Sequence, residues 1–502
     1  MSYNLSQSQF DTLKQQDKGL VLINKISNNN LLATTIFKKL QIKYQKCFLF
    51  ESSEKSDDKG RYSVIGIDPD KIWQCHDNIA LIKSATNNES AITSQDIINS
   101  LRNFINCAKI DYSNLHYQDY QLPAMIGGVF GYMGYDMIQY FEKSVNINHQ
   151  IDEINIPDSI YIRPQIIIIV DNFKNNILIC APIYNDSQDI SYVQLTKKID
   201  HIIHIISSDI QENKTDITNI KSKLDNNFKS SHSQQKYCQI VKECQEYISK
   251  GDIFQILPSQ RFTNKFPPWL NKFEYYLTLR KINPSPFLFY LQFDNFILCG
   301  SSPEIMVSLK NNKITVRPLA GTRKRGKNDI EDKKIEQELL SDEKELAEHL
   351  MLIDLGRHDV GRVSKKESVN VTKKMIIERY SHVMHISSNI EGVLKDDLDS
   401  LDALISAFPA GTVSGAPKIR AMEIIAQLEN IKRSFYAGCV GYFSANNDME
   451  SCITLRSALI KDNKIHIQTG AGVVYDSVAK SEYQECINKA AALIKAYNDM
   501  TT

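Results

Sequence analysis

The sequence predicts an α+β protein in which antiparallel strands and helices belong to one folded unit. Three observations lead to this prediction. Short apolar runs are joined by tight polar turns, amphipathic helical stretches are interspersed irregularly among them, and no regular strand–helix–strand repeat is present. The hydrophobic content of 42% and the charged content of 24% are ordinary for a globular enzyme.

The N-terminal part of the chain consists mainly of predicted strands. Apolar runs separated by turn signals predict these strands at residues 48–50, 62–67, 125–130, 160–170 and 177–181. Four glycines lie within apolar sequence, and no helix is expected after them, which argues against a dinucleotide-binding loop. We interpret Gly127, Gly128, Gly131 and Gly134 as positions where strands pack closely.

The composition becomes polar and lysine-rich between residues 187 and 233. An amphipathic helix is expected at residues 192–206, followed by a loose linker. This change predicts three regions along the chain, at residues 20–186, 187–232 and 233–497.

The C-terminal region mixes helices with hairpin-linked strands. Apolar residues at helical spacing predict helices at residues 237–248, 342–354, 401–407, 418–428 and 481–497. Apolar runs predict strands at residues 253–262, 287–298, 314–319, 438–444, 450–460 and 464–469. This irregular order favours α+β over a repeated βαβ unit.

The charge balance and the cysteine spacing argue against a nucleic-acid-binding protein and against a disulfide-stabilised one. The 59 basic and 59 acidic side chains balance, so no basic excess is available to bind nucleic acid. The ten cysteines are spread along the chain without a CxxC pair, which is typical of reduced, mostly buried thiols.

No targeting or membrane segment is evident. The first sixteen residues lack an apolar core, and the apolar run at residues 166–170 is far too short to cross a bilayer. We expect a soluble protein in a reducing compartment and no membrane partner. Frequent Asn, Ile and Lys indicate an AT-rich genome, which fits a bacterial cytoplasm, or a plastid stroma if an organelle genome encodes the chain.

Two helical stretches carry glutamates at a spacing that places them on one face. Glu345, Glu348 and His349 share one face of the first helix, while Leu346, Leu350 and Ile353 lie on another face that is available to the core. The second helix carries Glu482, Glu485 and Lys489 as one stripe. Such spacing usually marks a solvated face. If the two helices meet, however, four carboxylates need a cation, and their oxygens suit Mg²⁺.

Two glycine-rich segments have alternative interpretations. Residues 411–418 lack the Gly-Lys-Ser/Thr ending of a P-loop, so they are either an ordinary loop and cap or a turn whose N–H groups face an anion. Gly470-Ala471-Gly472 is either a tight turn or a close approach to a ligand.

Three single residues are equally open at this point. His385 is typical of a core histidine, Tyr442 is more often core than ligand contact, and Arg456 is either a surface residue or a carboxylate clamp.

Taken together, the motifs are far more specific than any one of them. In order, they are residues 251–255, 317–323, 342–349 with 354–357, 409–418, 469–474 and 482–489. This set resembles the chorismate-utilising enzymes, and most closely their anthranilate synthase large-subunit branch, over about residues 31–497. The resemblance implies antiparallel sheets packed as a sandwich-like core with helices outside. It also implies conversion of chorismate and ammonia to anthranilate and pyruvate, the first step of tryptophan biosynthesis.

Two positions distinguish this branch from its relatives. Isochorismate- and salicylate-forming relatives have a lysine where Gln255 stands, and aminodeoxychorismate synthases often have one where Ala320 stands. Having Gln255 and Ala320 together is similar to the branch that uses ammonia to form anthranilate. The alternatives are an aminodeoxychorismate synthase large subunit, an isochorismate or salicylate synthase, and a non-catalytic tryptophan-binding homologue.

The resemblance assigns roles to the residues of the active site. Glu348 and Glu485 would hold Mg²⁺, with Glu345 and Glu482 in its outer shell. The chorismate-binding residues would be Gly321, Thr322, Tyr442, Arg456, Gly470, Ala471, Gly472 and Lys489. The catalytic residues would be Glu345, as the acid for the leaving hydroxyl, together with His385, for the C2 proton, and Thr412.

The resemblance also implies regulation and a partner. The N-terminal region would bind L-tryptophan as a feedback inhibitor through Glu51, Ser52, Pro286, Phe287 and Leu288. The family usually has Tyr-Met at the last two positions, and asparagine where this chain has His358. No glutaminase motif is recognisable, so a separate glutamine amidotransferase subunit is expected to supply ammonia.

Overall fold

The computed structural model describes residues 3–16, 19–28, 30–53, 60–84, 92–112, 115, 117, 120–187, 190–208, 227–380 and 383–501. Within these residues, every pairing between the named strands is antiparallel. The predicted α+β class is confirmed.

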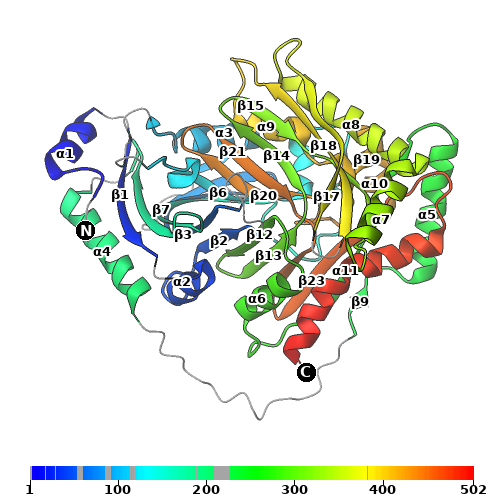
Figure 1. Cartoon of the computed structure of the whole chain (residues 1–502), viewed down its shortest axis with the longest axis horizontal. Helices are drawn as coiled ribbons and strands as arrows, with labels where there is room; N and C mark the ends of the chain where they lie inside the picture. The colour runs from blue at the N-terminus through cyan, green and yellow to red at the C-terminus, as the bar shows by residue number, and fades with distance from the viewer. Residues whose placement is uncertain are drawn as a thin grey trace.

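The helices lie mostly outside the strands (Figure 1). They are α1 (Gln7–Gln15), α2 (Ala33–Leu40), α3 (Ile97–Asn106), α4 (Tyr192–Ser207), α5 (Gln234–Ser249), α6 (Lys272–Ile282), α7 (Asp329–Ser341), α8 (Glu343–Val363), α9 (Ser400–Ala407), α10 (Lys418–Leu428) and α11 (Ala479–Thr501), with short 3-10 turns η2 (Ala124–Ile126), η3 (Tyr135–Tyr140) and η5 (Gly411–Val413).

The strands of the N-terminal part are β1 (Leu20–Ser27), β2 (Cys47–Glu51), β3 (Tyr62–His76), β4 (Ile79–Ser84), β5 (Ile92–Ser94), β6 (Gly128–Met133), β7 (Ser159–Asp171), β8 (Asn176–Ile183) and β9 (Lys229–Ser230). Those that follow are β10 (Gln255–Ile256), β11 (Ser259–Lys265), β12 (Phe287–Gln292), β13 (Phe296–Ser302), β14 (Ile305–Lys310), β15 (Lys313–Val316), β16 (Leu319–Lys324), β17 (Asn370–Arg379), β18 (Val383–Val393), β19 (Gly415–Ala416), β20 (Cys439–Ser444), β21 (Met449–Ile453), β22 (Ser457–Lys461) and β23 (Lys464–Gly470).

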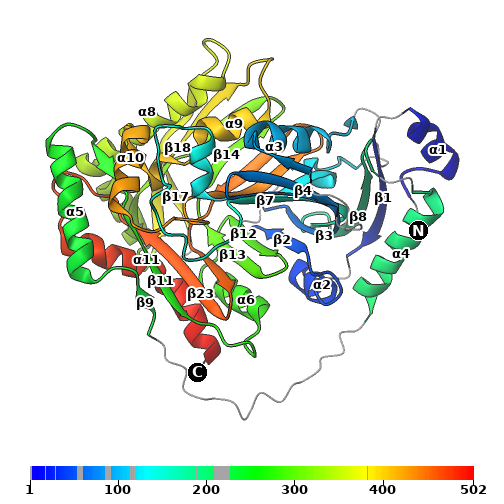
Figure 2. The same ribbon diagram turned by 180° about the vertical axis from the view of Figure 1, so that it is seen from behind.

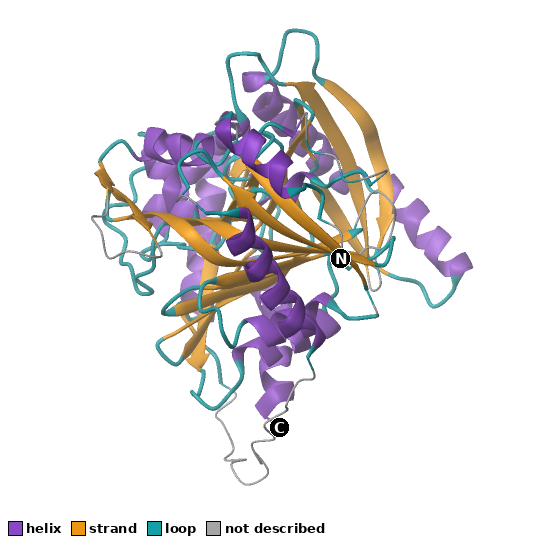
Figure 3. Cartoon of the chain, turned by 90° about the vertical axis from the view of Figure 1, so that its left-hand side faces the viewer, coloured by secondary structure: helices purple, strands orange, loops and turns teal. Residues whose placement is uncertain are grey.

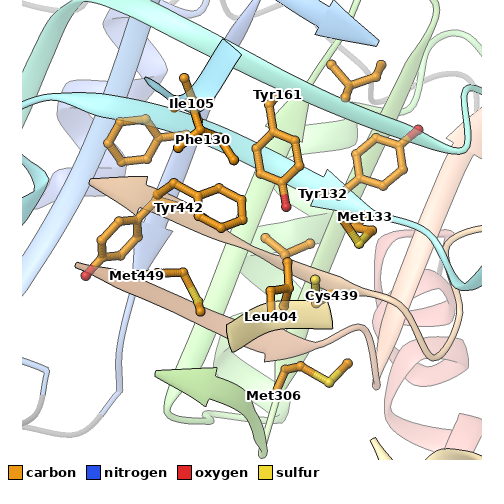
Figure 4. Packing of buried hydrophobic residues seen from close by; sticks show 14 of the residues in the cluster. Ile105, Phe130, Tyr132, Met133, Tyr161, Met306, Leu404, Cys439, Tyr442 and Met449 are labelled. Atoms are coloured by element: carbon orange, nitrogen blue, oxygen red, sulfur yellow. The ribbon is translucent and has the colours of Figure 1, made fainter. Parts of the chain in front are cut away.

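The strands separate two large hydrophobic clusters. Alternate residues of β7 show this: Ile167 and Ile169 face one cluster, whereas Ile166 and Ile168 face the other. The first cluster contains Phe130 and Tyr161 of the strands (Figure 4) and is also lined by residues of α3, α8, α9 and α10. The second is covered by α1, α2, α4, α6 and α11. Burial on both faces explains why residues 166–170 of this strand are all apolar. Figure 3 shows the strands with helices mostly outside them.

Strands from the N-terminal and C-terminal regions pair with one another. β2 lies beside β12, and β6 lies beside β20. The glycine positions explain part of this packing, because a Cβ on Gly128 of β6 would lie 2.2 Å from the Phe443 carbonyl oxygen of β20. The predicted helix at residues 192–206 is α4, and residues 209–226 of the predicted linker lie outside the described residues.

Four predicted strands are interrupted in the structure. The stretch 287–298 is divided into β12 and β13 by a bend at residues 293–295. The stretch 253–262 is divided into β10 and β11 before Pro258, which has no N–H to donate, and the stretch 314–319 is divided at Pro318. The stretch 450–460 is divided at Arg456, whose φ is +47°. The stretch 125–130 begins as the 3-10 turn η2 and becomes a strand only at Gly128.

One expected core residue is exposed. Leu350 of α8 faces solvent, whereas its neighbours His349, Leu352 and Ile353 are buried. The face of α8 that packs inward is therefore rotated from the predicted one.

A third cluster joins α5, α10 and α11, which lie together on the opposite side from α1 and α4 (Figures 1 and 2).

Eight of the ten cysteine thiols are buried and none of the ten is in a disulfide, as predicted. No helix in the described part of the chain combines the length and the hydropathy needed to span a membrane.

Candidate active site

The two glutamate helices do meet. Glu348 of α8 accepts a hydrogen bond of 2.8 Å from Gln255 Nε2. Burial raises the pKa of Glu348, and the charges of Glu345 and Glu485 raise it further. Burial also raises the pKa of Glu482, together with the charge of Glu485. Across the two helices, Glu348 and Glu485 therefore lie close enough for their charges to interact, which the spacing in sequence does not establish.

Three of these carboxylates have cationic or amide partners. Arg323 Nη1 donates to Glu345 at 2.9 Å, Lys489 Nζ lies 2.6 Å from Glu485 Oε1, and Gln255 binds Glu348. In the part of the chain that the structure describes, no three acidic, histidine or cysteine side chains converge as metal ligands. The donor set still fits a hard divalent cation, because it is made of oxygens and its like charges repel.

A cationic pocket adjoins these carboxylates. Arg456, between β21 and β22, donates from Nη1 to the Lys489 carbonyl at 2.5 Å. Burial lowers the pKa of Arg456, while Tyr436 and Glu485 raise it. Lys489 Nζ in turn donates to the Gly470 carbonyl at 3.0 Å. Two positive groups therefore lie at the end of β23, where an anionic group can bind.

The glycines after β23 allow close approach to this pocket. A Cβ on Gly472 would lie 3.1 Å from Gln255 Nε2, and a Cβ on Gly470 would lie 3.1 Å from the Tyr436 hydroxyl. Ala471 between them is buried in the cluster of α5, α10 and α11, so only its backbone is available to a ligand. The glycines therefore allow the Gln255 and Tyr436 side chains to lie close to the backbone after β23, and the binding of a ligand by this backbone stays a prediction.

His385 of β18 lies against the Gly321–Thr322 segment of β16. Its Nδ1 is 3.0 Å from Thr322 Oγ1 and 3.2 Å from the Gly321 carbonyl oxygen. A carbonyl can only accept, so that contact places the proton on Nδ1 and leaves the lone pair on Nε2. Burial lowers the pKa of His385, and the charge of Arg456 lowers it further. The ring is therefore a neutral base near this pocket.

Gly321 connects His385 with the glutamates. Its φ is +61°, and a Cβ there would lie 3.2 Å from Glu345 Oε2. Any side chain at this position would be strained and would press on the carboxylate. Glycine therefore leaves the space in front of Glu345 open.

Thr412 of η5 binds a buried acid, Glu304, that the sequence analysis did not identify. Its Oγ1 donates to Glu304 Oε1 at 2.9 Å. Glu304 is buried, and burial raises the pKa of its carboxyl to about 7. A small cavity of about 20 Å³ is lined by these two residues and Arg317. The available sequence signal was a single acid between two apolar strands, after Ser302-Pro303.

Tyr442 is the predicted substrate-binding residue that the structure does not bring to this cluster. Its ring packs in the hydrophobic core, 5.6 Å from the ring of Phe130 (Figure 4). Alternation along β20 directs it there. Tyr436, six residues earlier, lies instead beside Gly470 and Arg456, and it is the tyrosine that corrects this prediction.

The residues predicted to bind tryptophan also lie together. Glu51 is buried and pairs in register with Leu288 across β2 and β12. Its carboxylate accepts from the Tyr276 hydroxyl at 2.8 Å and from Arg280 Nε at 3.1 Å. Beside it, Ser53 N–H donates to the Ser285 carbonyl at 3.1 Å, which holds the segment containing Ser52 against the one containing Pro286 and Phe287.

Comparison with known proteins gives one family. A family model described as chorismate binding enzyme matches residues 45–495. A protein from Cereibacter sphaeroides named anthranilate synthase component 1 is 43% identical over 466 residues, covering 90% of this chain and 89% of that protein. One of the same name from Aquifex aeolicus is 39% identical over 498 residues, covering 99% and 98%.

Solved structures show the same fold. Anthranilate synthase component I from Streptococcus pneumoniae matches with a TM-score of 0.75 and 34% identity, over 93% of this chain and 99% of that chain. A menaquinone-specific isochorismate synthase from Escherichia coli matches with a TM-score of 0.67 and 17% identity, over 97% and 99%, which bears on the fold alone.

Proposed function

The chain belongs to the family of chorismate-binding enzymes, and on that premise we propose that it is the large subunit of an anthranilate synthase, which converts chorismate and ammonia to anthranilate and pyruvate. The observation that carries the proposal is the cluster in which Gln255 binds Glu348 of α8, Glu348 and Glu485 of α11 interact through their charges, and the charge of Arg456 acts on His385. The aminodeoxychorismate synthase alternative is not favoured, since the relatives at 38–44% identity are named anthranilate synthase component 1.

Recognition of the substrate follows from its two carboxylates. Arg456 and Lys489 offer positive charge at the end of β23, and the backbone of Gly470 and Gly472 permits close approach. This pocket suits the enolpyruvyl carboxylate. The ring carboxylate would then lie toward the four glutamates, where Glu348 and Glu485 would hold Mg²⁺ with Glu345 and Glu482 behind them. When bound, Mg²⁺ supplies a positive charge that offsets repulsion between the acidic side chains and an anionic substrate.

Gln255 is suited to an uncharged nucleophile. Its Nε2 donates to Glu348, so its Oε1 is left as an acceptor, and within the described residues this buried oxygen has no partner. Ammonia can donate an N–H to it. An acceptor at this position supports ammonia as the group that adds to ring C2.

The leaving 4-hydroxyl needs a proton. Glu345 was predicted as the donor, and that remains an expectation; its carboxylate accepts a hydrogen bond from Arg323. Glu304 is held by Thr412, and burial raises the pKa of its carboxyl to about 7, so a substantial fraction carries a proton at neutral pH, and we propose it as the acid. His385, with Nε2 free of its proton, would remove the C2 proton as pyruvate is lost.

Two further parts of the proposal concern control and supply. L-tryptophan would bind where β2 and β12 place Glu51 beside Leu288, with the buried carboxylate facing the inhibitor's ammonium group. A separate glutamine amidotransferase subunit would supply ammonia, since the relatives are named as component 1 of an enzyme.

The test is turnover by the purified chain. Chorismate, Mg²⁺ and an ammonium salt at mildly alkaline pH are expected to give the fluorescence of anthranilate, and the signal should disappear when either Mg²⁺ or ammonium is omitted. Fluorescence that persists without ammonium would contradict ammonia as the nucleophile. No product of any kind from chorismate would contradict the proposal as a whole.

A further inference from the structure

One short structural unit connects two side chains of the proposed active site, Gln255 and Thr412. Strands β10 and β19 form a separate two-stranded ribbon, with Gln255 opposite Ala416 and Ile256 opposite Gly415. Gln255 on the first strand reaches Glu348. Thr412, three residues before the second strand, reaches Glu304. The distance between Gln255 and Thr412 therefore depends on the geometry of this ribbon.

The ribbon is too short to fix its own geometry. Each strand contributes two residues, and a ladder of that length is marginal without other contacts. Gly415 adopts φ +145°, and a Cβ there would lie 2.3 Å from the Gln255 carbonyl oxygen. The two strands thus approach closely, and something outside the ribbon must hold its end.

Arg433 occupies that end. Its Nη2 donates to the Leu257 carbonyl at 2.6 Å, directly after β10, and its Nη1 donates to the Val413 carbonyl at 2.8 Å, shortly before β19. One planar guanidinium therefore bridges the two chain segments that lead to Gln255 and Thr412. Its geometry is rigid, because the donors of a guanidinium form a fixed fork.

Glu429 fixes the guanidinium in turn. Its two oxygens accept from Arg433 Nε at 2.9 Å and Nη2 at 2.7 Å, and both side chains are 1% exposed. Glu429 Oε1 also accepts from the Ser259 N–H at 2.8 Å, where β11 begins. A buried ion pair with every contact satisfied is weak evidence of stabilisation but strong evidence of a defined geometry.

We propose that the Glu429–Arg433 ion pair is a positioning device for the active site, which sets the placement of Gln255 relative to Thr412 and so aligns the nucleophile with the proton donor. The inference rests on the proposed function, and it assigns to Arg433 and Glu429 no contact with the substrate. A displacement of the ribbon by a fraction of an ångström acts on the reaction rather than on substrate capture, since Arg456 and Lys489 lie outside it.

The chain contains a matched control. Arg163 is also fully buried, binds Asp70 through two hydrogen bonds of 2.9 and 2.6 Å, donates to a backbone carbonyl, and lies over a tyrosine ring. Arg433 has a similar set, which includes the ring of Tyr135, but it binds a second backbone carbonyl where Arg163 binds a second carboxylate, Asp186. Asp70 and Arg163 belong to β3 and β7, and neither adjoins a residue of the proposed site. Arg163→Lys therefore reproduces the structural defect without the positioning defect.

The experiment compares Arg433→Lys with Arg163→Lys by melting temperature, kcat and KM for chorismate with ammonium as nucleophile. Lysine keeps the charge but cannot bridge two carbonyls and a carboxylate in one plane. Arg433→Lys is expected to lower kcat at least about 10-fold and to change KM by less than about 3-fold. Arg163→Lys is expected to lower the melting temperature comparably and to keep kcat within about 2-fold of the parent.

If Arg433→Lys does not fold, Glu429→Gln decides the question, because it keeps the volume and one acceptor. It is expected to lower kcat about 3- to 10-fold with KM nearly unchanged. A kcat within about 2-fold of the parent in the folded variant, or a fall no larger than that of Arg163→Lys, would overturn the inference. A parent chain that does not turn over chorismate would instead refute the proposed function, so the two failures are distinguishable.

Discussion

At the scale of single residues, two carboxyl groups near the proposed leaving group have opposite surroundings. Glu304 is buried with Thr412 as its donor, and burial raises the pKa of its carboxyl to about 7. Glu345 lies beside the Arg323 guanidinium at 2.9 Å. A proton donor is effective when its pKa lies close to the working pH, so these surroundings favour Glu304.

Replacing each acid by its amide separates the two candidates. Glu304→Gln is expected to lower kcat about 10²- to 10⁴-fold with a small change in KM, and Glu345→Gln is expected to lower it much less. Because a rising pH removes the proton from Glu304, kcat at saturating free ammonia should decline above about pH 7 in the parent, and this decline should be absent from Glu304→Gln. Steady-state kinetics against pH provide the measurement. A kcat for Glu304→Gln within about 3-fold of the parent would return the role to Glu345.

The metal ligands are the second prediction at this scale. Glu348→Gln and Glu485→Gln each remove one charged oxygen donor, and we expect each to raise the Mg²⁺ concentration for half-maximal turnover at least about 10-fold. Calorimetric titration with Mg²⁺ in the presence of chorismate measures the same loss without turnover. Glu343→Gln, an exposed glutamate on the same helix, is the control and should bind Mg²⁺ as the parent does.

At the scale of elements, the pairing of β2 with β12 builds the predicted tryptophan site. Glu51 lies directly opposite Leu288, and its carboxylate is bound by Tyr276 and Arg280. Glu51→Gln keeps the shape but removes the charge that would face an ammonium group, so the concentration of tryptophan for half inhibition should rise at least about 10-fold. For Glu51→Gln and for the parent, the rate with tryptophan is compared with the rate of the same protein without tryptophan. Unchanged inhibition would place the tryptophan site elsewhere.

The elements also show what sequence patterns can and cannot predict. The helix at residues 418–428 is α10 with the same bounds, because its apolar spacing and Pro417 define it locally. The strand expected at 450–460 is two strands, because Arg456 adopts a left-handed conformation that its residue type does not signal. Local chemistry therefore accounts for α10 and for the breaks at Pro258 and Pro318, whereas the break at Arg456 has no signal in its residue type.

The same limit applies to the candidate site. The spacing of Glu345 and Glu348 placed both on one face of α8, but only the fold shows that α11 lies opposite. Tyr442 and Tyr436 lie six residues apart in similar apolar sequence, and only the direction of β20 shows that the first belongs to the core. Glu304 was missed because a single buried acid has no spacing pattern.

At the scale of the whole molecule, the N-terminal and C-terminal regions are joined by shared strands and by one buried acid. Asp136 of η3 accepts from the Ser434 N–H at 2.9 Å, across that junction. Burial raises the pKa of Asp136 to about 7, and the charge of Asp158 raises it further, whereas Lys432 lowers it. The folded state therefore prefers the protonated acid near neutral pH.

This acid makes the stability of the molecule depend on pH. The pKa of Asp136 in the folded state lies above its unfolded value of about 3.9. Its contribution to the free energy of unfolding is therefore fully present below about pH 3.9 and is lost as the pH rises through about 7. Asparagine cannot ionise. The free energy of unfolding of Asp136→Asn, relative to that of the parent, should therefore rise by roughly 2 to 4 kcal/mol between pH 5 and pH 8. Urea unfolding at both pH values measures the difference. A gain that is equal at pH 5 and pH 8 would contradict the assignment.

The central claim is that this chain joins ammonia to chorismate at ring C2. The most direct measurement is to incubate the purified chain with chorismate, Mg²⁺ and ¹⁵N-labelled ammonium and to identify the products by chromatography and mass spectrometry. The account predicts ¹⁵N-anthranilate and an equal amount of pyruvate. A para-substituted aminodeoxychorismate, or unlabelled isochorismate, would leave the family membership intact and contradict the proposed reaction.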